Sequence, residues 1–368
     1  MAFCNIFDAR TQFQKKLKRN MTNSQTCMKT RSLQMIQWLK TLFNEQPFKQ
    51  TIASADASFR QYFRLTFESD YQGYKTLIVM DAPPPQEDCA PFVKVAKLLL
   101  DAGINVPKVL AVDLEKGFLL LTDLGDSTLL SLLNNETAPK LYQQASDALI
   151  KMQLATQSGL LPDYDDAMLT REMQLFPDWY INQYLGVTLT HAQQLVLLNT
   201  FDELKINILA QSQVTVHRDY HSRNLMICNE SYGNDNPGVL DFQDAVQGAI
   251  TYDLVSLLKD AYIGWDEEQI IDWAVHYWQP AKKAGLPVPH DFSEFYRNFE
   301  FMGVQRHIKV LGIFARLSHR DGKKGYLKDM PLVMSYLRKT CERYNELRPM
   351  LRLLNQLEHV KPQEGYTF

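Results

Sequence analysis

The chain has 368 residues, of which 45% are hydrophobic and 22% are charged, and its formal net charge is −3. This length allows two domains, or two lobes that share a cleft, and the composition is ordinary for a soluble globular protein. The small net charge disfavours a general nucleic-acid binder, and no apolar run reaches the ~20 residues that span a bilayer. We therefore expect neither nucleic-acid nor membrane partners. We also expect the chain to be a monomer.

The five cysteines are scattered, and none forms a C-x-x-C pair. This pattern argues against a disulfide framework or a zinc knuckle and favours a reducing, cytoplasmic location. Residues 1–30 are polar and basic and lack the apolar segment of a signal peptide. We expect them to form a flexible extension, or to precede a true start at Met21 or Met28.

The next segment, 31–123, is predicted to form an N-terminal nucleotide-binding lobe. Apolar residues recur at helical spacing over 32–43. Short β-type runs follow, and one helix, stopped by Gly103, interrupts them. The predicted strands cover 59–67, 75–82, 105–113 and 117–124, and the predicted helix covers 91–103.

Residues 124–368 are predicted to form a mainly helical C-terminal lobe, joined to the first by a connector at 122–127. Helical periodicity dominates from about 128 onward. Three short apolar runs, at 214–217, 224–228 and 238–242, read instead as small strands beside loops. The predicted fold class is therefore α+β, with a sheet-rich lobe, a hinge and a helical lobe.

The three short runs surround the stretch "HRDYHSRN", which carries an H-x-D-x-x-x-x-N motif from His217 through Asp219 to Asn224. In phosphoryl transfer such an aspartate orients a substrate hydroxyl, and the asparagine binds Mg²⁺. A second metal carboxylate is then required, and Asp241 in "GVLDFQD" follows an apolar run as that role demands. A zinc site on the alternating His217, Asp219 and His221 is the weaker interpretation, because the remaining histidines are solitary.

"HRDYHSRN", "LDFQD" and "TYDLVSLLKD" together resemble the aminoglycoside phosphotransferase and choline kinase superfamily, whose members share the protein-kinase-like fold. Further segments, including "SFRQYFRLTF", "VMDAPPPQEDCAPFVKVAKLL" and "GVQRHIKVLGIFARL", are most similar to bacterial anomeric kinases of N-acetylmuramate and N-acetylglucosamine. The resemblance implies transfer of the γ-phosphate of ATP to the C1 hydroxyl of an amino sugar, in peptidoglycan recycling.

The resemblance also implies roles for individual residues. Asp219 would be the catalytic carboxylate, and Asn224 and Asp241 would coordinate Mg²⁺. His217 and Asp253 would support the loop structurally rather than react.

For the nucleotide, the resemblance implies that adenine lies between the lobes, against backbone groups of Asp123 and Leu124. The loop 53–58, "ASADAS", would cover the phosphates through residues such as Ser54 and Ser58, although it contains no glycine. The third strand offers only Met80 and Asp81 where kinases carry a lysine.

Two arginines are candidates to replace that lysine. Strand alternation places Phe59, Phe63, Leu65 and Phe67 on one face and Arg60, Tyr62 and Arg64 on the other. We expect Arg64, or failing that Arg60, to hold the phosphates. The alternative is that both are solvated charges on a strand.

The acceptor is predicted from the helix around residue 310. Arg306, Lys309 and Arg316 share one face of this helix, which suits an anionic acceptor such as the lactyl carboxylate of N-acetylmuramate. The predicted substrate-binding residues are therefore His221, Arg306, His307 and Arg316. The alternatives are a kinase of the same fold acting on an aminoglycoside, an amino alcohol or another sugar, and a pseudokinase that only binds a nucleotide.

Overall fold

The structure is a computed structural model that describes residues 30–55, 59–229 and 236–358. These residues divide into two compact units. Unit 1 contains the described residues up to Cys89 together with Val109–Asp123, and unit 2 contains Ala90–Lys108 and the described residues from Leu124 onward. The helix at Ala90–Asp101 therefore groups with unit 2, whereas the sequence analysis assigns it to the N-terminal lobe. The lobe boundaries drawn from the sequence stay a prediction.

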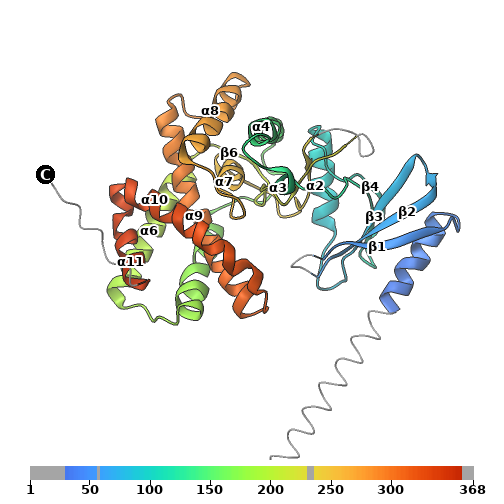
Figure 1. Cartoon of the computed structure of the whole chain (residues 1–368), viewed down its shortest axis with the longest axis horizontal. Coiled ribbons are helices and arrows are strands. Elements are labelled where there is room, and N and C mark those ends of the chain that lie inside the picture. Colours follow the sequence, from blue (N-terminus) through green and yellow to red (C-terminus); the bar gives the residue numbers. More distant parts are fainter. Residues whose placement is uncertain (1–29, 56–58, 230–235, 359–368) are drawn as a thin grey trace, which may run out of the picture. The chain divides into compact units, whose positions relative to one another are not determined.

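Unit 1 is a five-stranded antiparallel sheet with the strand order β1-β2-β3-β5-β4 (Figure 1). Apolar alternation sets its register, because it places the large side chains of neighbouring strands on one face. Phe63 of β2 lies opposite Val79 of β3, which in turn lies opposite Leu120 of β5. The strands are β1 (Phe48–Ala55), β2 (Gln61–Tyr71), β3 (Tyr74–Asp81), β4 (Val109–Asp113) and β5 (Phe118–Thr122).

The helix predicted over 32–43 spans residues 30–42 and covers one face of this sheet (Figure 1). Met35 and Leu39 of the helix pack in one core cluster with Leu65, Phe67 and Leu77 of the sheet. Phe59 departs from the expected aromatic face, since it is 66% exposed and precedes the strand. The buried side of β2 therefore begins at Phe63, which is partly buried against the cluster.

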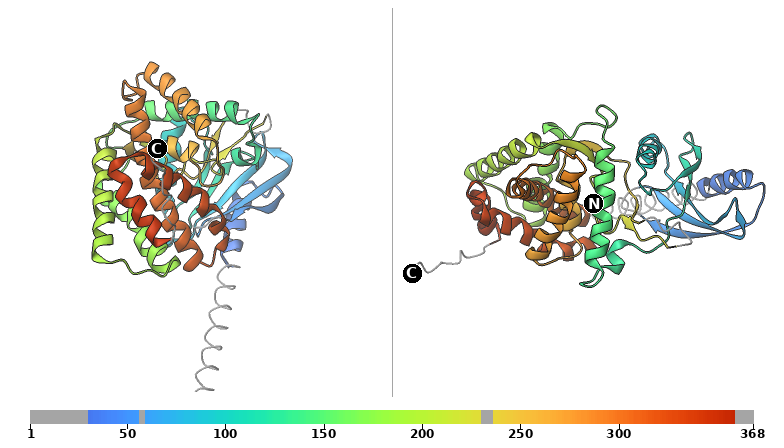
Figure 2. Two further views of the ribbon diagram at one scale, coloured as in Figure 1. Left: turned by 60° about the vertical axis from the view of Figure 1, so that its left-hand side comes forward. Right: turned by 90° about the horizontal axis from the view of Figure 1, so that it is seen from above.

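Unit 2 is built around the long helix α9, which contacts α6, α7, α10 and η1 (Figure 2). Most of the α9 side chains between Phe299 and Leu317 are buried, charged ones included. The close approach of η1 requires a glycine, because a Cβ on Gly312 would lie 2.5 Å from the carbonyl carbon of Leu175. The helices of unit 2 are α2 (Ala90–Asp101), α3 (Leu129–Leu132), α4 (Ala138–Leu154), α5 (Asp166–Met173), η1 (Phe176–Tyr184), α6 (His191–Ala210), α7 (Tyr252–Leu258), α8 (Glu267–Lys283), α9 (Phe292–His319), η3 (Lys324–Asp329), α10 (Met330–Arg343), η4 (Asn345–Leu347) and α11 (Arg348–Leu357).

Two short antiparallel ladders complete unit 2 and confirm the three short strands predicted there. β6 (Gln213–Val216) pairs with β9 (Val246–Ala249), and β7 (Leu225–Met226) pairs with β8 (Gly238–Val239). The predicted α+β class is confirmed. Strands β1 and β9 are not predicted from the sequence, because β1 combines polar residues with two alanines and β9 contains a glycine and a glutamine.

Candidate active site

The predicted catalytic loop, 217–224, connects β6 to β7, so a ladder anchors each of its ends. The β7–β8 ladder also brings the end of the loop to the segment that follows β8. The Leu240 N–H donates to the Asn224 carbonyl at 2.9 Å, which places Asp241 beside Asn224. Phe242 is fully buried and packs on Phe92 of α2 at a ring distance of 4.7 Å. Asn224 and Asp241 are 17 positions apart in the chain, and backbone pairing as well as a side-chain contact holds them together.

The two predicted metal ligands are neighbours. Asn224 Nδ2 lies 3.3 Å from Asp241 Oδ2 and donates to the Asp219 carbonyl at 3.1 Å. Gln243 donates from Nε2 to Asp241 Oδ1 at 2.8 Å, and its own Oε1 is buried without a hydrogen-bond partner. Asp241 adopts a positive φ of 63°, a conformation that aspartate tolerates better than most residues. The amide of Asn224 and the carboxylate of Asp241 thus lie side by side, and each carries an oxygen of the kind that Mg²⁺ prefers as a ligand.

Asp219 is half-buried and carries an unusual carboxylate. Its backbone groups are bonded, to His217 Nδ1 and to the N–H of His221, but its carboxylate makes neither a hydrogen bond nor an ion pair within the described residues. Burial opposes its ionisation, but the charges of Lys309, His221 and Arg306 outweigh burial and lower the pKa of Asp219. The carboxylate is thus kept ionised while it remains available to an incoming hydroxyl.

Asp253, at the start of α7, holds the beginning of the loop. Its carboxylate accepts the N–H of His217 at 2.7 Å and the N–H of Arg218 at 3.0 Å. Asp253 is fully buried, and burial raises its pKa to about 7 although the two N–H donors oppose the rise. Burial likewise lowers the pKa of His217 to about 4, so this imidazole is neutral and its Nδ1 accepts the Asp219 N–H.

A second carboxylate, Asp260, holds the middle of the loop, and the sequence analysis misses it. Its Oδ2 accepts both the N–H of Ser222, at 3.0 Å, and the Ser222 hydroxyl. Its Oδ1 accepts the N–H of Tyr262 at 3.2 Å. The ring of Tyr262 lies 5.3 Å from His221 and 3.5 Å below the guanidinium of Arg223. Asp260 follows α7 directly in "SLLKD", and that position is the only signal that could have identified it.

A third group of charges surrounds Arg218, and the sequence analysis misses its central member, Glu172 of α5. Glu172 binds Arg218 Nη2 at 2.5 Å and Lys309 Nζ at 2.9 Å. Arg306 donates to the Arg218 carbonyl at 3.1 Å. Arg218 itself takes a left-handed φ of 76°. The loop is therefore fixed from α5, α7 and α9 together.

The predicted acceptor residues lie in different environments. Arg306 is only 5% exposed and is used in holding the loop. His307 stacks on Tyr336 at 5.2 Å, and neither of its buried ring nitrogens has a hydrogen-bond partner. His221 Nδ1 and Arg316 Nε are also buried without partners. These unsatisfied atoms are the polar groups that a polyhydroxyl ligand could satisfy.

The predicted nucleotide residues in unit 1 are paired with carboxylates. Arg64 binds Asp123 in a fork, Nε to Oδ2 at 2.6 Å and Nη2 to Oδ1 at 3.1 Å. Arg60 donates from Nε to Glu87 Oε2 at 3.0 Å, and Glu87 Oε1 also accepts the Phe59 N–H. Of the remaining predicted residues, Leu124 belongs to unit 2, and Ser58 and the side chain of Ser54 lie outside the described residues.

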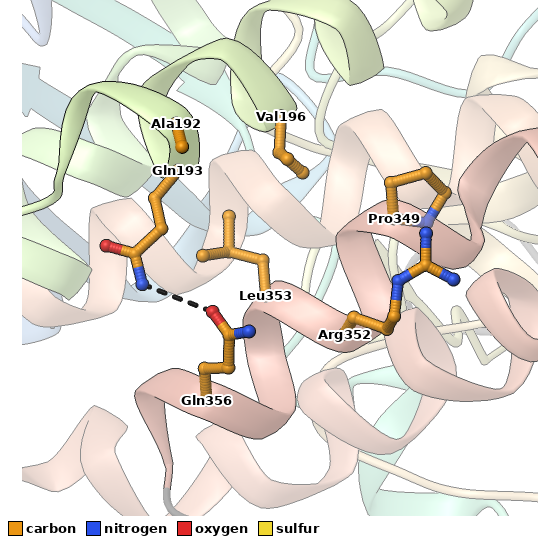
Figure 3. A pocket seen from close by; sticks show the side chains of 7 residues that line it. All are labelled: Ala192, Gln193, Val196, Pro349, Arg352, Leu353 and Gln356. Atoms are coloured by element: carbon orange, nitrogen blue, oxygen red, sulfur yellow. Dashed lines mark hydrogen bonds between the residues drawn. The ribbon is translucent and has the colours of Figure 1, made fainter.

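A cavity lies elsewhere in unit 2, between α6 and α11 (Figure 3). Gln193 and Gln356 point toward one another there and share a hydrogen bond of 3.2 Å. The lining is mostly apolar and includes no residue of the catalytic loop, so we assign the cavity no part in catalysis. Its lining residues are Ala192, Gln193, Val196, Pro349, Arg352, Leu353 and Gln356.

Among the described residues, no three or more histidine, cysteine, aspartate or glutamate side chains are grouped so as to hold a metal ion. No helix in the same part of the chain has the length and apolar character required to cross a bilayer.

Solved structures of other proteins share this fold. A choline kinase from Streptococcus pneumoniae superposes with a TM-score of 0.59 at 11% identity, over 83% of this chain and 99% of that one. The predicted protein-kinase-like fold is thereby confirmed.

Sequence relatives are much closer. An N-acetylmuramate/N-acetylglucosamine kinase of Neisseria meningitidis is 46% identical over 92% of this chain and 99% of its own length. A protein of the same description from Pseudomonas aeruginosa is 50% identical over 83% of this chain and 87% of its own. Residues 49–286 also match the model of the phosphotransferase enzyme family. The chain therefore belongs to the phosphotransferase enzyme family.

Proposed function

We propose that this phosphotransferase transfers the γ-phosphoryl group of ATP to the anomeric C1 hydroxyl of N-acetylmuramate or N-acetylglucosamine. The observation that carries the proposal is the 46% identity to the Neisseria kinase of these two sugars, which extends over 99% of that relative. Such a reaction belongs in the cytoplasm, where ATP is available, and returns cell-wall amino sugars to metabolism.

In the proposed step, Asp219 accepts the proton of the C1 hydroxyl as its oxygen bonds to the γ-phosphorus. The bond between that phosphorus and the β–γ bridging oxygen breaks, and ADP leaves. Support comes from the carboxylate of Asp219, which is ionised and makes no bond to other described residues. An anomeric hydroxyl is more acidic than an ordinary alcohol, so a carboxylate is a sufficient base.

Asn224 and Asp241 are the residues we propose to hold Mg²⁺, which when bound offsets the negative charge of the phosphates. The site suits a hard cation because a carboxylate and an amide, which can both offer oxygen ligands, lie side by side and because the buried Oε1 of Gln243 has no hydrogen-bond partner. The Leu240 backbone bond to Asn224 keeps the two ligands together before any ion binds, so little reorganisation is required.

For the nucleotide, we propose that Arg64 or Arg60 of unit 1 takes the role of the missing third-strand lysine. We also propose that Asp123, Leu124, Ser54 and Ser58 contact the nucleotide. The guanidinium of Arg64 is oriented by its fork on Asp123, and that of Arg60 by Glu87. The double replacement of both arginines by alanine should raise the KM for ATP about tenfold or more and leave the KM for the sugar unchanged. An unchanged KM for ATP would refute both assignments.

We propose that Arg316 meets the lactyl carboxylate of N-acetylmuramate, with His221 and His307 nearer to the sugar ring. The side chain of Arg316 makes no hydrogen bond or ion pair with other described residues, and a buried N–H without an acceptor costs ~1–3 kcal/mol. A carboxylate from the ligand would remove that cost. Burial and the nearby Arg320 lower the pKa of Arg316, so its surroundings already favour an added negative charge.

The decisive experiment compares N-acetylmuramate, N-acetylglucosamine, kanamycin and choline as acceptors and locates the phosphate in the product by phosphorus NMR. We expect a C1 phosphate on the amino sugars. Phosphorylation of kanamycin or choline instead, or ATP binding without any transfer, would refute the proposal. In the same assay Arg316→Ala should raise the KM for N-acetylmuramate and spare the KM for N-acetylglucosamine, which lacks the carboxylate.

A further inference from the structure

The carboxylate of Asp219 stands among cations but binds none of them. Among the charged groups around it, Lys309 acts on Asp219 most strongly, and Arg306 also contributes. Arg218 is its neighbour in the chain. A buried or half-buried carboxylate is normally paired with a cation, and such a pair would occupy the oxygens that must accept the hydroxyl proton. Another group among the described residues must therefore bind these cations and keep them from pairing with the Asp219 carboxylate.

Glu172 supplies the competing anion. Its Oε1 accepts from Arg218 Nη2 at 2.5 Å and from Lys309 Nζ at 2.9 Å, so one carboxylate oxygen binds both cations. Its Oε2 accepts from the Tyr164 hydroxyl and from Gln305 Nε2, at 3.4 Å, which leaves both oxygens fully engaged. Burial opposes ionisation of Glu172, but Lys309 and Arg218 outweigh it and bring its pKa to about 2. Glu172 is therefore a permanent buried anion.

The other hydrogen bonds of these cations are also made to groups other than the Asp219 carboxylate. Lys309 Nζ donates to the Tyr252 hydroxyl at 2.9 Å, and Arg218 Nη1 donates to the Asp244 carbonyl at 3.3 Å. Arg306 donates to the Arg218 carbonyl. The neighbouring acid Asp253 is already occupied by two loop N–H groups. If Glu172 lost its charge, Asp219 would be the available carboxylate for both released cations.

We propose that Glu172 is a positioning residue of the phosphotransferase site, which withdraws Arg218 and Lys309 from Asp219 and so leaves the catalytic carboxylate free to accept the acceptor's proton. This inference rests on the proposed function for the role of Asp219, but not on which sugar is the acceptor. In this arrangement the cations stabilise the ionised form of Asp219 through space. Glu172 prevents the same cations from bonding to the carboxylate oxygens of Asp219.

The test compares Glu172→Gln with Glu172→Asp. Glutamine keeps the size and shape of the side chain and loses the charge, whereas aspartate keeps the charge and shortens the side chain. The proposal predicts that Glu172→Gln lowers kcat about tenfold or more with KM values within about threefold, and that Glu172→Asp is the milder change. A purely structural role predicts the opposite order, which would overturn the proposal.

Two further variants make the result specific. Glu300→Gln is the matched control, because Glu300 is also buried and binds two cations, Lys259 at 3.5 Å and Arg343, neither of which is a loop residue. It should lower the thermal midpoint but not kcat. Adding Lys309→Met to Glu172→Gln restores the wild-type net charge and should recover part of the lost kcat, and no recovery would count against the proposal. If Glu172→Gln does not fold, a fall of more than about tenfold in the kcat of Glu172→Asp decides against it.

A crystal structure of the Glu172→Gln protein gives an answer that needs no acceptor. Arg218 or Lys309 should then lie within hydrogen-bond distance of the Asp219 carboxylate, and both cations remaining on residue 172 would overturn the inference. Failure of the wild-type enzyme to phosphorylate any amino sugar would refute the proposed function instead, so the two failures are distinguishable.

Discussion

Replacing Asp253 with asparagine should weaken the attachment of the catalytic loop without creating a cavity, because the two side chains have nearly the same size. The carboxylate accepts two backbone N–H groups, from His217 at 2.7 Å and Arg218 at 3.0 Å, and an asparagine oxygen can accept only one of them. The other N–H then faces the amide NH₂. Above a pH of about 7, where Asp253 is ionised, that N–H loses a hydrogen bond to a charged acceptor, worth ~1.5–3 kcal/mol. The remaining bond weakens because its acceptor becomes neutral, which brings the total to about 2–4 kcal/mol.

Hydrogen exchange measures this loss where it occurs. An opening free energy lower by about 2–4 kcal/mol corresponds to exchange that is roughly thirty to several hundred times faster. We expect that change in peptides covering 214–220, together with a lower kcat because Asp219 is held less firmly. Asp272→Asn is the matched control, because Asp272 lies on α8 with its side chain 64% exposed. Unchanged protection of 214–220 in Asp253→Asn would refute the reasoning that this carboxylate holds the loop.

Three other predictions follow from the same geometry. Asp219→Asn should lower kcat about a hundredfold or more while ATP still binds, and normal turnover in steady-state assays would exclude Asp219 as the base. Burial lowers the pKa of His307 well below its ordinary value, so the folded state resists protonation and the unfolding free energy falls as pH drops below about 6.5. His307→Gln should reduce the pH dependence of the unfolding free energy by up to about 1.4 kcal/mol per pH unit. Thermal midpoints measured from about pH 7.5 to about pH 5 test this, and an unchanged pH dependence contradicts it. Gly312→Ala should destabilise the protein by ~1–3 kcal/mol because its Cβ would clash with Leu175, whereas Gly303→Ala, whose Cβ would meet only ordinary contacts, should leave the thermal midpoint equal or higher.

The sequence predicts those parts of the site that are close together in the chain. His217, Asp219 and Asn224 lie within eight residues, and Asp241 follows a short apolar run, so spacing alone indicates that they act together. The structure brings Asn224 within 3.3 Å of Asp241, and the roles of both as metal ligands stay predictions.

The sequence does not predict the groups that support the loop from distant helices. Glu172 sits in "DAMLTREM", where nothing distinguishes it from a solvated glutamate on an amphipathic helix. Its burial depends on the packing of α5 against α9, which no local pattern encodes. The shared face of Arg306 and Lys309 is visible in the sequence, but whether that face meets a ligand or a buried acid depends on the same packing.

The left-handed backbone of Arg218 and Asp241 has a consequence for laboratory evolution of this enzyme. Both residues hold a positive φ without being glycine, and such positions each store of order 1–3 kcal/mol of strain. Glycine would relieve the strain but would delete a side chain that the site uses. At Arg218 the loss of the buried pair with Glu172, about 3–5 kcal/mol, would outweigh the relief of strain, so glycine should not be selected there. Selection for heat resistance alone should instead favour glycine at Asp241, and the resulting proteins would be more stable but would lack a proposed metal ligand.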